Sequence, residues 1–338
     1  MSVRVLIVDD SSFFRQLLEK ALTEAGLTVA GTASNGAEAI EKVRSLHPDL
    51  VTMDLSMPHM GGLEATEVIM AYSPVPLIVI SAWVDHDHNE NAVRALAAGA
   101  LEIVEKPARK GGPDLDAFVS ELTAKIKLLA RIKVIRHIKG KLDAPVPGRN
   151  GDAPYRIVAV GASTGGPQAL ARLFAGLPRE FPAGIALVQH ITPGFTEGFV
   201  KWLSSSTPLA VRLAAGGDRV SPGTILVAPE RSHLVVGEDG KVQLDASSRG
   251  VVHQPSADVL FESVAQSYGS QAVGVLLTGM GSDGARGLKS IREAGGRTIA
   301  QDETTCVVFG MPKVAIDLGA ADEVLPVDVI SKALLSFV

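Results

Sequence analysis

Three residue types that together perform nucleophilic catalysis follow apolar runs in the second half of the sequence. Ser163 lies in GASTG, a match to G-x-S-x-G, directly after one such run. His190 follows the run 184–189, and Asp283 lies in the glycine-rich TGMGSDGARG after the run 272–277. A serine hydroxyl becomes a nucleophile when a histidine takes its proton and a carboxylate orients that histidine. The set predicts a serine hydrolase in which Ser163, His190 and Asp283 act as nucleophile, base and orienting acid.

The surroundings of the serine favour this interpretation over nucleotide binding. Gly166 and Pro167 follow it, and proline is favoured in the first turn of a helix, so Ser163 sits in a strand-to-helix turn, as a nucleophile elbow requires. Glycine-rich turns of this kind also bind phosphates, which is the main alternative. However, GASTGG has neither the G-x-G-x-x-G spacing nor the lysine of a Walker loop. Two other histidines, His233 and His253, follow no such clear strand and are interpreted as surface or cleft-lining residues.

A second group of reactive residues follows the apolar runs of the first third of the chain. Asp9 and Asp10 end the first run, Asp54 follows another, and Ser81 and Lys106 follow two more. Ligands of open parallel sheets bind at the carboxyl ends of strands, so these side chains are expected to converge. Clustered carboxylates favour a hard cation such as Mg²⁺, and the cation and lysine together stabilise a phosphoryl group.

The elements that must position both groups are short strands alternating with amphipathic helices, which predicts an α/β fold with two doubly wound parallel-sheet domains. The first is expected to be five-stranded and flavodoxin-like, and the second a larger Rossmann-like domain. Strands of the first domain are expected at 3–8, 28–33, 50–53, 77–80 and 101–104, with helices at 13–25 and 37–46 among them. Strands of the second are expected at 156–161, 184–189, 224–228, 272–277 and 297–300.

The joint between these domains combines a basic helix with a linker. Residues 121–139 place isoleucine and leucine at helical spacing, with lysine and arginine on the other face. Such a helix either packs on the first domain or binds an acidic partner or a membrane surface, and packing is favoured. The stretch KLDAPVPGRNGDAP that follows predicts a flexible linker. The predicted domains are therefore 1–120 and 153–338, joined by 121–152.

Composition excludes several classes of function. The net charge of −5 gives no electrostatic reason to bind nucleic acid. No apolar run is long enough to insert into a bilayer, and the N-terminus MSVRVLIVDD has no signal-peptide core. The single cysteine, Cys306, rules out an internal disulfide, as is typical of a reducing cytoplasm. We therefore expect a cytoplasmic protein.

Residues 3–120 resemble the receiver domain of two-component response regulators. The resemblance rests on the order Asp-Asp, Asp, Ser, Lys-Pro at the strand ends and on MP-x-M-x-G after the third aspartate. It implies that Asp54 accepts a phosphoryl group from a histidine kinase. It also implies a Mg²⁺ site formed by Asp9, Asp10, Asp54 and the backbone carbonyl of Ser56.

The same resemblance assigns two switch residues and shows two departures. Ser81 would sense the phosphoryl group, and Lys106 would pair with it. Gly61 stands where receivers usually carry an acid or asparagine, and Ile103 where many carry an aromatic switch residue. The second departure leaves phosphorylation intact but argues against a signal based on aromatic rotation.

The region from about 153 to 338 is similar to the catalytic domain of chemotaxis protein-glutamate methylesterases, the CheB family. One departure lies in APERSHL, where Glu230 and Arg231 replace expected small residues, which affects the cleft rim and not the triad. The stretches that carry the resemblance are AVGASTGGPQAL, LVQHITPGFTEGFV, ILVAPERSHL, QPSADVLFESVA, VLLTGMGSDGARGL and QDETTCVVFGMPKVA.

The family resemblance assigns roles to residues of this domain. It carries the triad roles to Ser163, His190 and Asp283, and it makes the Met280 amide the oxyanion donor. The implied activity is phosphorylation-activated hydrolysis of glutamyl methyl esters on chemoreceptors, with deamidation of receptor glutamines by the same site. Mg²⁺ is then needed for receiver phosphorylation, and no cofactor for hydrolysis. Two alternatives remain open: a second domain that only binds partners, and a hydrolase acting on a different ester.

Overall fold

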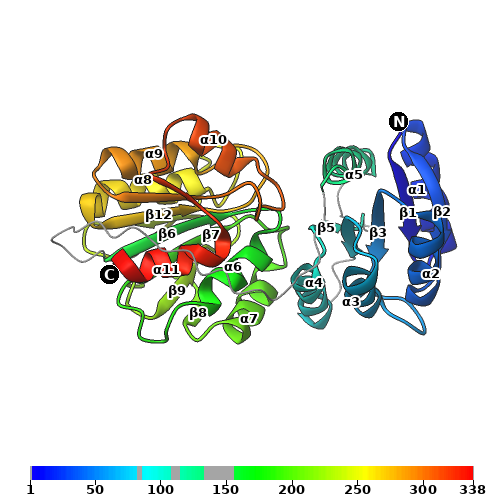
Figure 1. Ribbon diagram of the computed structural model, residues 1–338, viewed down its shortest axis with the longest axis horizontal. Helices are drawn as coiled ribbons and strands as arrows, with labels where there is room; N and C mark the ends of the chain where they lie inside the picture. Colours follow the sequence, from blue (N-terminus) through cyan, green and yellow to red (C-terminus); the bar gives the residue numbers. More distant parts are fainter. Residues whose placement is uncertain (1, 82–85, 108–114, 133–155, 338) are drawn as a thin grey trace. The chain divides into compact units, whose positions relative to one another are not determined.

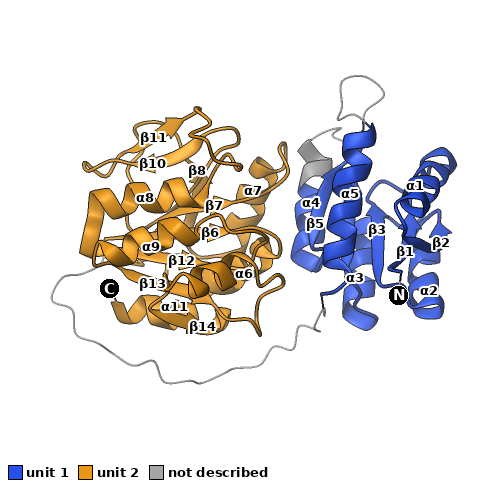
Figure 2. Cartoon of the chain, turned by 90° about the horizontal axis from the view of Figure 1, so that it is seen from above, with its two compact units in different colours: residues 1–139 blue, residues 140–338 orange. Residues whose placement is uncertain are grey.

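The chain folds into two compact units, residues 1–139 and 140–338 (Figure 2). The computed structural model describes the chain except for residues 1, 82–85, 108–114, 133–155 and 338. The predicted linker and the last part of the predicted basic helix lie outside the described residues. Each unit is therefore described by itself.

The first unit contains a five-stranded parallel sheet of order β2-β1-β3-β4-β5. Helices α1 and α5 lie on one face, and α2, α3 and α4 lie on the other (Figure 1). The expected doubly wound fold is confirmed. Its strands are β1 (Arg4–Val8), β2 (Thr28–Ala33), β3 (Leu50–Asp54), β4 (Leu77–Ser81) and β5 (Glu102–Glu105). Its helices are α1 (Ser12–Glu24), α2 (Gly36–Leu46), α3 (Gly62–Tyr72), α4 (His86–Ala98) and α5 (Leu115–Leu129).

The inner strands of this sheet read as continuous apolar runs because helices cover both of their sides. All residues of β3 and β4 are buried, including the polar ends Asp54 and Ser81. Side chains cap the first two helices: Ser11 accepts a hydrogen bond from the Phe14 amide at the start of α1. The buried strand ends leave their polar side chains at one edge of the sheet.

Helix α5 differs from the helix expected at 121–139. It begins at Leu115, and it ends at Leu129, with a turn through residue 132. The earlier start follows from Phe118, which lies one turn before Leu122 and extends the same buried stripe, packing on Phe14 of α1 with ring centroids 6.1 Å apart. The described part of the helix thus packs on the first unit, as favoured above. The predicted boundary at residue 120 falls within this helix.

The second unit contains a seven-stranded parallel sheet of order β14-β13-β12-β6-β7-β9-β8 and an antiparallel hairpin, β10-β11. Helices α8, α9 and α10 cover one face, and α6, α7 and α11 cover the other (Figure 1). The strands are β6 (Ile157–Ala162), β7 (Gly184–Gln189), β8 (Ala210–Leu213), β9 (Thr224–Val227), β10 (His233–Val236), β11 (Val242–Asp245), β12 (Ala272–Leu276), β13 (Arg297–Gln301) and β14 (Glu323–Leu325). The helices are α6 (Gly166–Ala175), α7 (Thr196–Ser206), α8 (Ala257–Tyr268), the short 3₁₀ helix η1 (Gly269–Gln271), α9 (Ala285–Glu293), α10 (Met311–Asp317) and α11 (Val327–Phe337).

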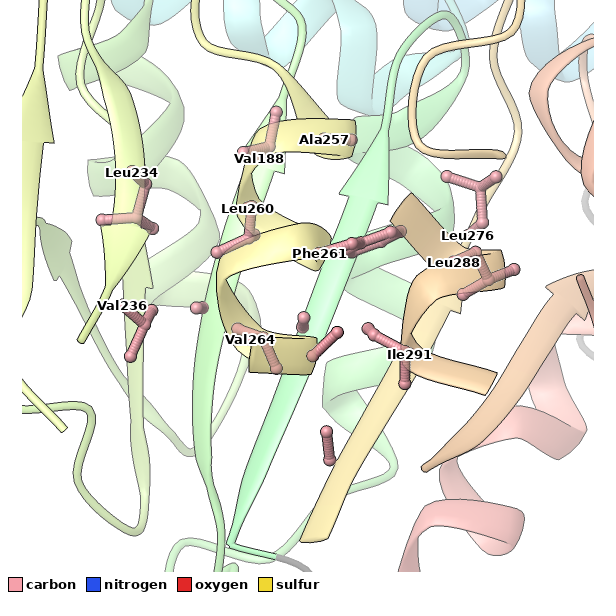
Figure 3. Packing of buried hydrophobic residues seen from close by; sticks show 14 of the residues in the cluster. Val188, Leu234, Val236, Ala257, Leu260, Phe261, Val264, Leu276, Leu288 and Ile291 are labelled. Carbon is pink, nitrogen blue, oxygen red and sulfur yellow. The ribbon is translucent and has the colours of Figure 1, made fainter. Parts of the chain in front are cut away.

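Helix α8 lies at the centre of the larger core. Phe261, Leu260 and Val264 point from it into a buried cluster that also takes side chains from β10, β12 and α9 (Figure 3). Fully burying one such side chain is worth about 1.5–3 kcal/mol, so this packing holds α8 firmly against the sheet. No helix among the described residues is both long enough and apolar enough to cross a bilayer.

Candidate active site and phosphoacceptor site

The predicted nucleophile lies in a tight turn between β6 and α6. Its amide donates to the carbonyl of Thr278 at 3.0 Å, which ties the turn to the end of the neighbouring strand β12. Gly165 has a φ of +76°, and an added Cβ there would lie 2.4 Å from the side chain of Val307. Glycine is required on both grounds. The turn leaves Ser163 half-buried at the carboxyl edge of the sheet.

A residue that sequence reasoning missed joins the serine to the histidine. The amide nitrogen Nε2 of buried Gln189 donates to the carbonyl of Ser163 at 2.9 Å and to that of His190 at 2.7 Å. The backbone of His190 is also held by its amide, which donates to Ala162 at 2.9 Å. The available signal was a polar residue closing the otherwise apolar run GIALVQ.

The predicted base and acid are in direct contact. Nε2 of His190 lies 2.8 Å from Oδ2 of Asp283, and both side chains are largely buried. An ionised carboxylate only accepts hydrogen bonds, so Nε2 carries the proton and Nδ1 keeps its lone pair. Nδ1 is buried and has no hydrogen-bond partner among the described residues. The pair therefore leaves one basic nitrogen available to a proton donor.

The N-terminus of α8 supplies the remaining partners of the carboxylate. Ser256 Oγ donates to Asp283 Oδ1 at 2.6 Å, the Ala257 amide donates to Oδ2 at 2.7 Å, and the Asp258 amide donates to Oδ1 at 3.1 Å. In return, the Asp258 carboxylate accepts from the Gly287 amide in the first turn of α9 at 2.8 Å. Asp283 thus caps α8, and Asp258, which lies in α8, caps α9. This reciprocal arrangement was not predicted.

These contacts fix the charge of the acid. Burial opposes ionisation of the Asp283 carboxyl, but the hydrogen bond and charge of His190, together with the donors of the α8 N-terminus, hold its pKa well below the ordinary value. Hydrogen bonds to a carboxylate favour its charged form, as does the positive end of a helix dipole. Asp283 is therefore ionised throughout the neutral range.

Replacing Ser256 with alanine is expected to lower both stability and turnover. The substitution removes the N-cap of α8, where Ser256 Oγ accepts from the Val259 amide, and one of the donors to Asp283. Loss of a serine N-cap costs about 1 kcal/mol, or about 2–4 °C in Tm for a domain of this size. Ser256→Thr retains a hydroxyl at this fully buried position and serves as the conservative comparison. Thermal unfolding and kcat on one substrate test this, and an unchanged Tm in Ser256→Ala would contradict it.

The predicted oxyanion donor, the Met280 amide, lies in a loop beside the nucleophile. An added Cβ on the preceding Gly279 would lie 2.7 Å from the Cβ of Ser163. The loop is held by the Gly279 amide, which donates to Val308 at 3.1 Å, and by the Gly279 carbonyl, which accepts from Met311 at 2.9 Å. These contacts place the loop against the nucleophile, and the role of the Met280 amide stays a prediction.

The unusual Glu230 of APERSHL has a structural role. Its Oε1 accepts hydrogen bonds from the amides of Gly194 at 2.6 Å and Thr196 at 3.3 Å, at the start of α7. A carboxylate there complements the exposed amides and dipole of the helix N-terminus. None of these contacts involves the triad residues, in line with the expectation that the departure alters the surroundings of the cleft.

The two other histidines lie close to the predicted triad. His233 is fully buried, and its Nδ1 accepts from the Ser256 amide at 3.2 Å. Burial lowers its pKa, so its ring is neutral. His253 stacks on His190, with ring centroids 4.3 Å apart and planes inclined by 22°. His233 is therefore an interior residue behind Ser256, which neither of the two interpretations given above expected, whereas His253 is exposed and stacks on the predicted base.

In the first unit, Lys106 binds two carboxylates at the carboxyl edge of the sheet. Its Nζ lies 2.6 Å from Asp9 Oδ2 and 2.7 Å from Asp54 Oδ2. One carboxylate oxygen from each of Asp9, Asp10 and Asp54 lies within 4.8 Å of the others. Hard oxygen donors at this spacing suit Mg²⁺. The residues present therefore fit the predicted metal, with Asp10 exposed at the mouth of the group.

The other predicted receiver residues lie around this group. The Ser56 amide approaches Asp54 Oδ1 at 3.4 Å, and the Lys106 amide donates to the Ser81 carbonyl at 2.8 Å. Gly62 approaches so closely that an added Cβ would lie 1.9 Å from the Asp54 carbonyl oxygen. This contact is a physical reason for glycine in the MPHMGG stretch. Ile103, at the departure from the aromatic switch, is buried.

The charges of this pocket depend on one another. Burial raises the pKa of Asp54, against the charge of Lys106, which lowers it. Burial also opposes the charge of Lys106, but Asp54 and Asp9 outweigh it and raise the pKa of the lysine. Lys106 therefore stays positively charged. Its ammonium lies beside the buried Asp54 carboxylate, where it can offset the further negative charge of a group bound to that carboxylate.

Comparisons with known proteins match two families to different parts of the chain. Residues 5–112 match the family described as response regulator receiver domain, and residues 158–334 match CheB methylesterase. Protein-glutamate methylesterase/protein-glutamine glutaminase 2 of Anaeromyxobacter dehalogenans is 45% identical over 98% of this chain and 96% of its own length. A Geobacter metallireducens protein named protein-glutamate methylesterase/protein-glutamine glutaminase 4 is 44% identical over 99% of this chain and 98% of its own length.

A solved structure extends the likeness of the second unit to its fold. The crystal structure of the Thermotoga maritima CheB methylesterase catalytic domain matches with a TM-score of 0.53 and 42% sequence identity. The match covers 55% of this chain and 100% of that one. Fold and comparisons together define a response regulator whose receiver is joined to a hydrolase domain. The chain belongs to the CheB methylesterase family.

Proposed function

We propose that this chain is a phosphorylation-activated protein-glutamate methylesterase, acting on methylated chemoreceptors and also deamidating receptor glutamines. The observation that carries the proposal is the His190–Asp283 pair, whose buried Nδ1 has no partner in the described structure while Gln189 links the backbones of His190 and Ser163. The names of the two relatives described above, both protein-glutamate methylesterase/protein-glutamine glutaminases, support the substrate class.

The reaction follows from these groups. Nδ1 of His190 takes the proton of Ser163 as the hydroxyl oxygen attacks the side-chain carbonyl carbon of a glutamyl methyl ester. The C–O bond to the methoxy group breaks, and the imidazolium returns the proton to the departing methanol. Water then attacks the acyl-enzyme and gives one proton to His190, which passes it to Ser163 as the ester bond to the serine breaks, and the glutamic acid so formed loses its remaining proton to solvent. The Met280 amide would donate to the carbonyl oxygen while it carries negative charge.

The same residues suffice for deamidation. Glutamine carries an amino group on the same side-chain carbon, so ammonia leaves in place of methanol and the same acyl-enzyme forms. A thiol alternative is disfavoured, because burial raises the pKa of Cys306 to about 12. Ser163 is therefore the nucleophile for both substrates.

The receiver would control this activity through Asp54. A histidine kinase is the proposed phosphodonor, and the fit of Asp9, Asp10 and Asp54 supports a Mg²⁺ ion held with the Ser56 carbonyl. The ion would supply charge neutralisation for the phosphoryl group on the carboxylate. Lys106 would pair with the phosphoryl oxygens, and Ser81 would contact them. We place the enzyme in the cytoplasm, where a kinase has its nucleotide and a lone cysteine stays reduced.

The test of this function is release of methanol from methylated receptor fragments. The full chain is incubated with Mg²⁺, with and without acetyl phosphate, and methanol is measured beside a panel of small esters. Methanol release that rises with the phosphodonor supports the proposal. Hydrolysis of small esters alone would favour a different substrate, and the absence of any turnover would favour a domain that only binds partners.

Deleting residues 1–140 is expected to raise basal methanol release about tenfold over the unphosphorylated full chain. The receiver contributes no residue to the triad, and in this family the unphosphorylated receiver is expected to cover the catalytic cleft. Interfaces between domains of one chain bury a modest area. A tenfold shift in the fraction of molecules whose cleft is covered needs only about 1.4 kcal/mol. The second unit has its own core and matches a separately crystallised domain, so the fragment is expected to fold. Lower turnover by a folded fragment would make the receiver an activator instead.

A further inference from the structure

We propose that His253 is a positioning residue for the catalytic base, holding the His190 ring in the orientation that aims Nδ1 at Ser163. This inference rests on the function proposed above and adds a residue to the three of the triad. It starts from the stacked pair of imidazoles, with centroids 4.3 Å apart and planes 22° from parallel.

The contacts of His190 show what the stack contributes. Its side chain makes one hydrogen bond, from Nε2 to Asp283, and Nδ1 has no partner in the described part of the chain. A ring held through one nitrogen can rock about that hydrogen bond, which moves the opposite nitrogen out of line with the serine. A flat ring against its face removes this freedom. Misplacing a reacting group by about 1 Å can cost about 10²-fold in rate, so such a restraint matters.

His253 is itself held by the segment that binds the acid. It lies three residues before Ser256, whose hydroxyl donates to Asp283 at 2.6 Å. One short segment at the start of α8 thus touches both partners of the base–acid pair. His253 is an exposed residue whose ring makes no hydrogen bond among the described residues, so it acts on His190 through the stacking contact, and the backbone of this segment places it there.

The charge of His253 suits this role. His190 becomes an imidazolium when it takes the serine proton, and a neutral aromatic face tolerates that charge whereas a second cation repels it. The charged groups facing His253 are His190, at the end of β7, and Asp283, in the loop before α9. Burial and the charge of His190 lower the pKa of His253, against the attraction of Asp283. The lowered pKa favours the neutral form of the stacked ring.

The test compares three variants of the full chain in methanol release. His253→Ala removes the stack and is expected to lower kcat about tenfold with KM changed less than twofold, because an aromatic pair is worth about that factor. His253→Phe keeps a flat ring and is expected to restore kcat to within about threefold. Val252→Ala, at a neighbouring residue that is 93% exposed, is the matched control and should behave as the unmodified chain.

The outcomes separate this role from others. Unchanged kcat in His253→Ala overturns the inference, and so does a Phe variant as slow as the Ala variant, which would mean that the imidazole nitrogens act directly. A rise in KM at constant kcat would make His253 a substrate contact instead. Thermal unfolding of each variant shows whether a loss reflects folding. If the unmodified chain releases no methanol, the proposed function has failed rather than this inference.

Discussion

Replacing Ser163 with alanine is expected to lower kcat for methanol release by about 10⁶-fold while leaving the domain folded. The hydroxyl is the only group lost, and the turn around it is held by backbone hydrogen bonds, including those to Thr278 and Gln189, that alanine keeps. Asp283→Asn is expected to cost less, about 10⁴-fold, because serine and histidine remain.

Single-turnover measurements on a methylated receptor fragment, with methanol as the readout, give both values. Ser205→Ala is a suitable control, because that serine is exposed at the far end of α7 and bonds only the Trp202 carbonyl among the described residues. Near-normal turnover in Ser163→Ala would exclude the serine hydrolase mechanism. A variant with the same Tm as the unmodified chain rules out loss of folding as the cause.

Replacing Asp54 with asparagine is expected to abolish stimulation by Mg²⁺ and acetyl phosphate completely while leaving basal hydrolysis in place. Asparagine has nearly the shape of aspartate but cannot form an acyl phosphate. It also removes one of the two negative partners of Lys106, whose Nζ lies 2.7 Å from Asp54 Oδ2. The ratio of rates with and without phosphodonor is the quantity to measure.

Asp49→Asn is the matched control for this experiment. Asp49 lies at the opposite end of β3, where its side chain accepts from the Arg4 amide at 2.8 Å, and an asparagine oxygen can keep that bond. The control should retain the full response. A persisting response in Asp54→Asn would mean that another residue accepts the phosphoryl group, and the assignment of the pocket would be wrong.

The fold was predictable where buried strands are long and apolar. The runs ending at Asp54, Ser81 and Gln189 are buried along their whole length, so each is a continuous apolar stretch in the sequence. Strands β8 and β14 were missed because they are edge strands of four and three residues with alternating or partial exposure. The hairpin β10-β11 was missed for a similar reason, since each strand has four residues.

The chemistry was predictable to the level of residue types at strand ends, and the supporting contacts were not. Ser163, His190 and Asp283 stand in motifs, whereas Gln189 acts through hydrogen bonds to carbonyls that only the folded backbone brings together. Ser256 is of a residue type common at helix N-caps, but its hydrogen bond to Asp283 joins residues that are 27 apart in the chain. Such contacts depend on tertiary packing, which periodicity and spacing do not encode.

The mutual capping of α8 and α9 has an evolutionary consequence. Asp283 holds three donors of the α8 N-terminus, and Asp258 holds the first turn of α9, so this carboxylate belongs to the architecture as much as to the reaction. Ser163 has no comparable structural duty. In a lineage that had lost hydrolysis and kept the domain as a binding module, the serine would be free to drift while the aspartate stayed under selection. A retained aspartate is therefore poor evidence of activity, and the serine is the residue to inspect.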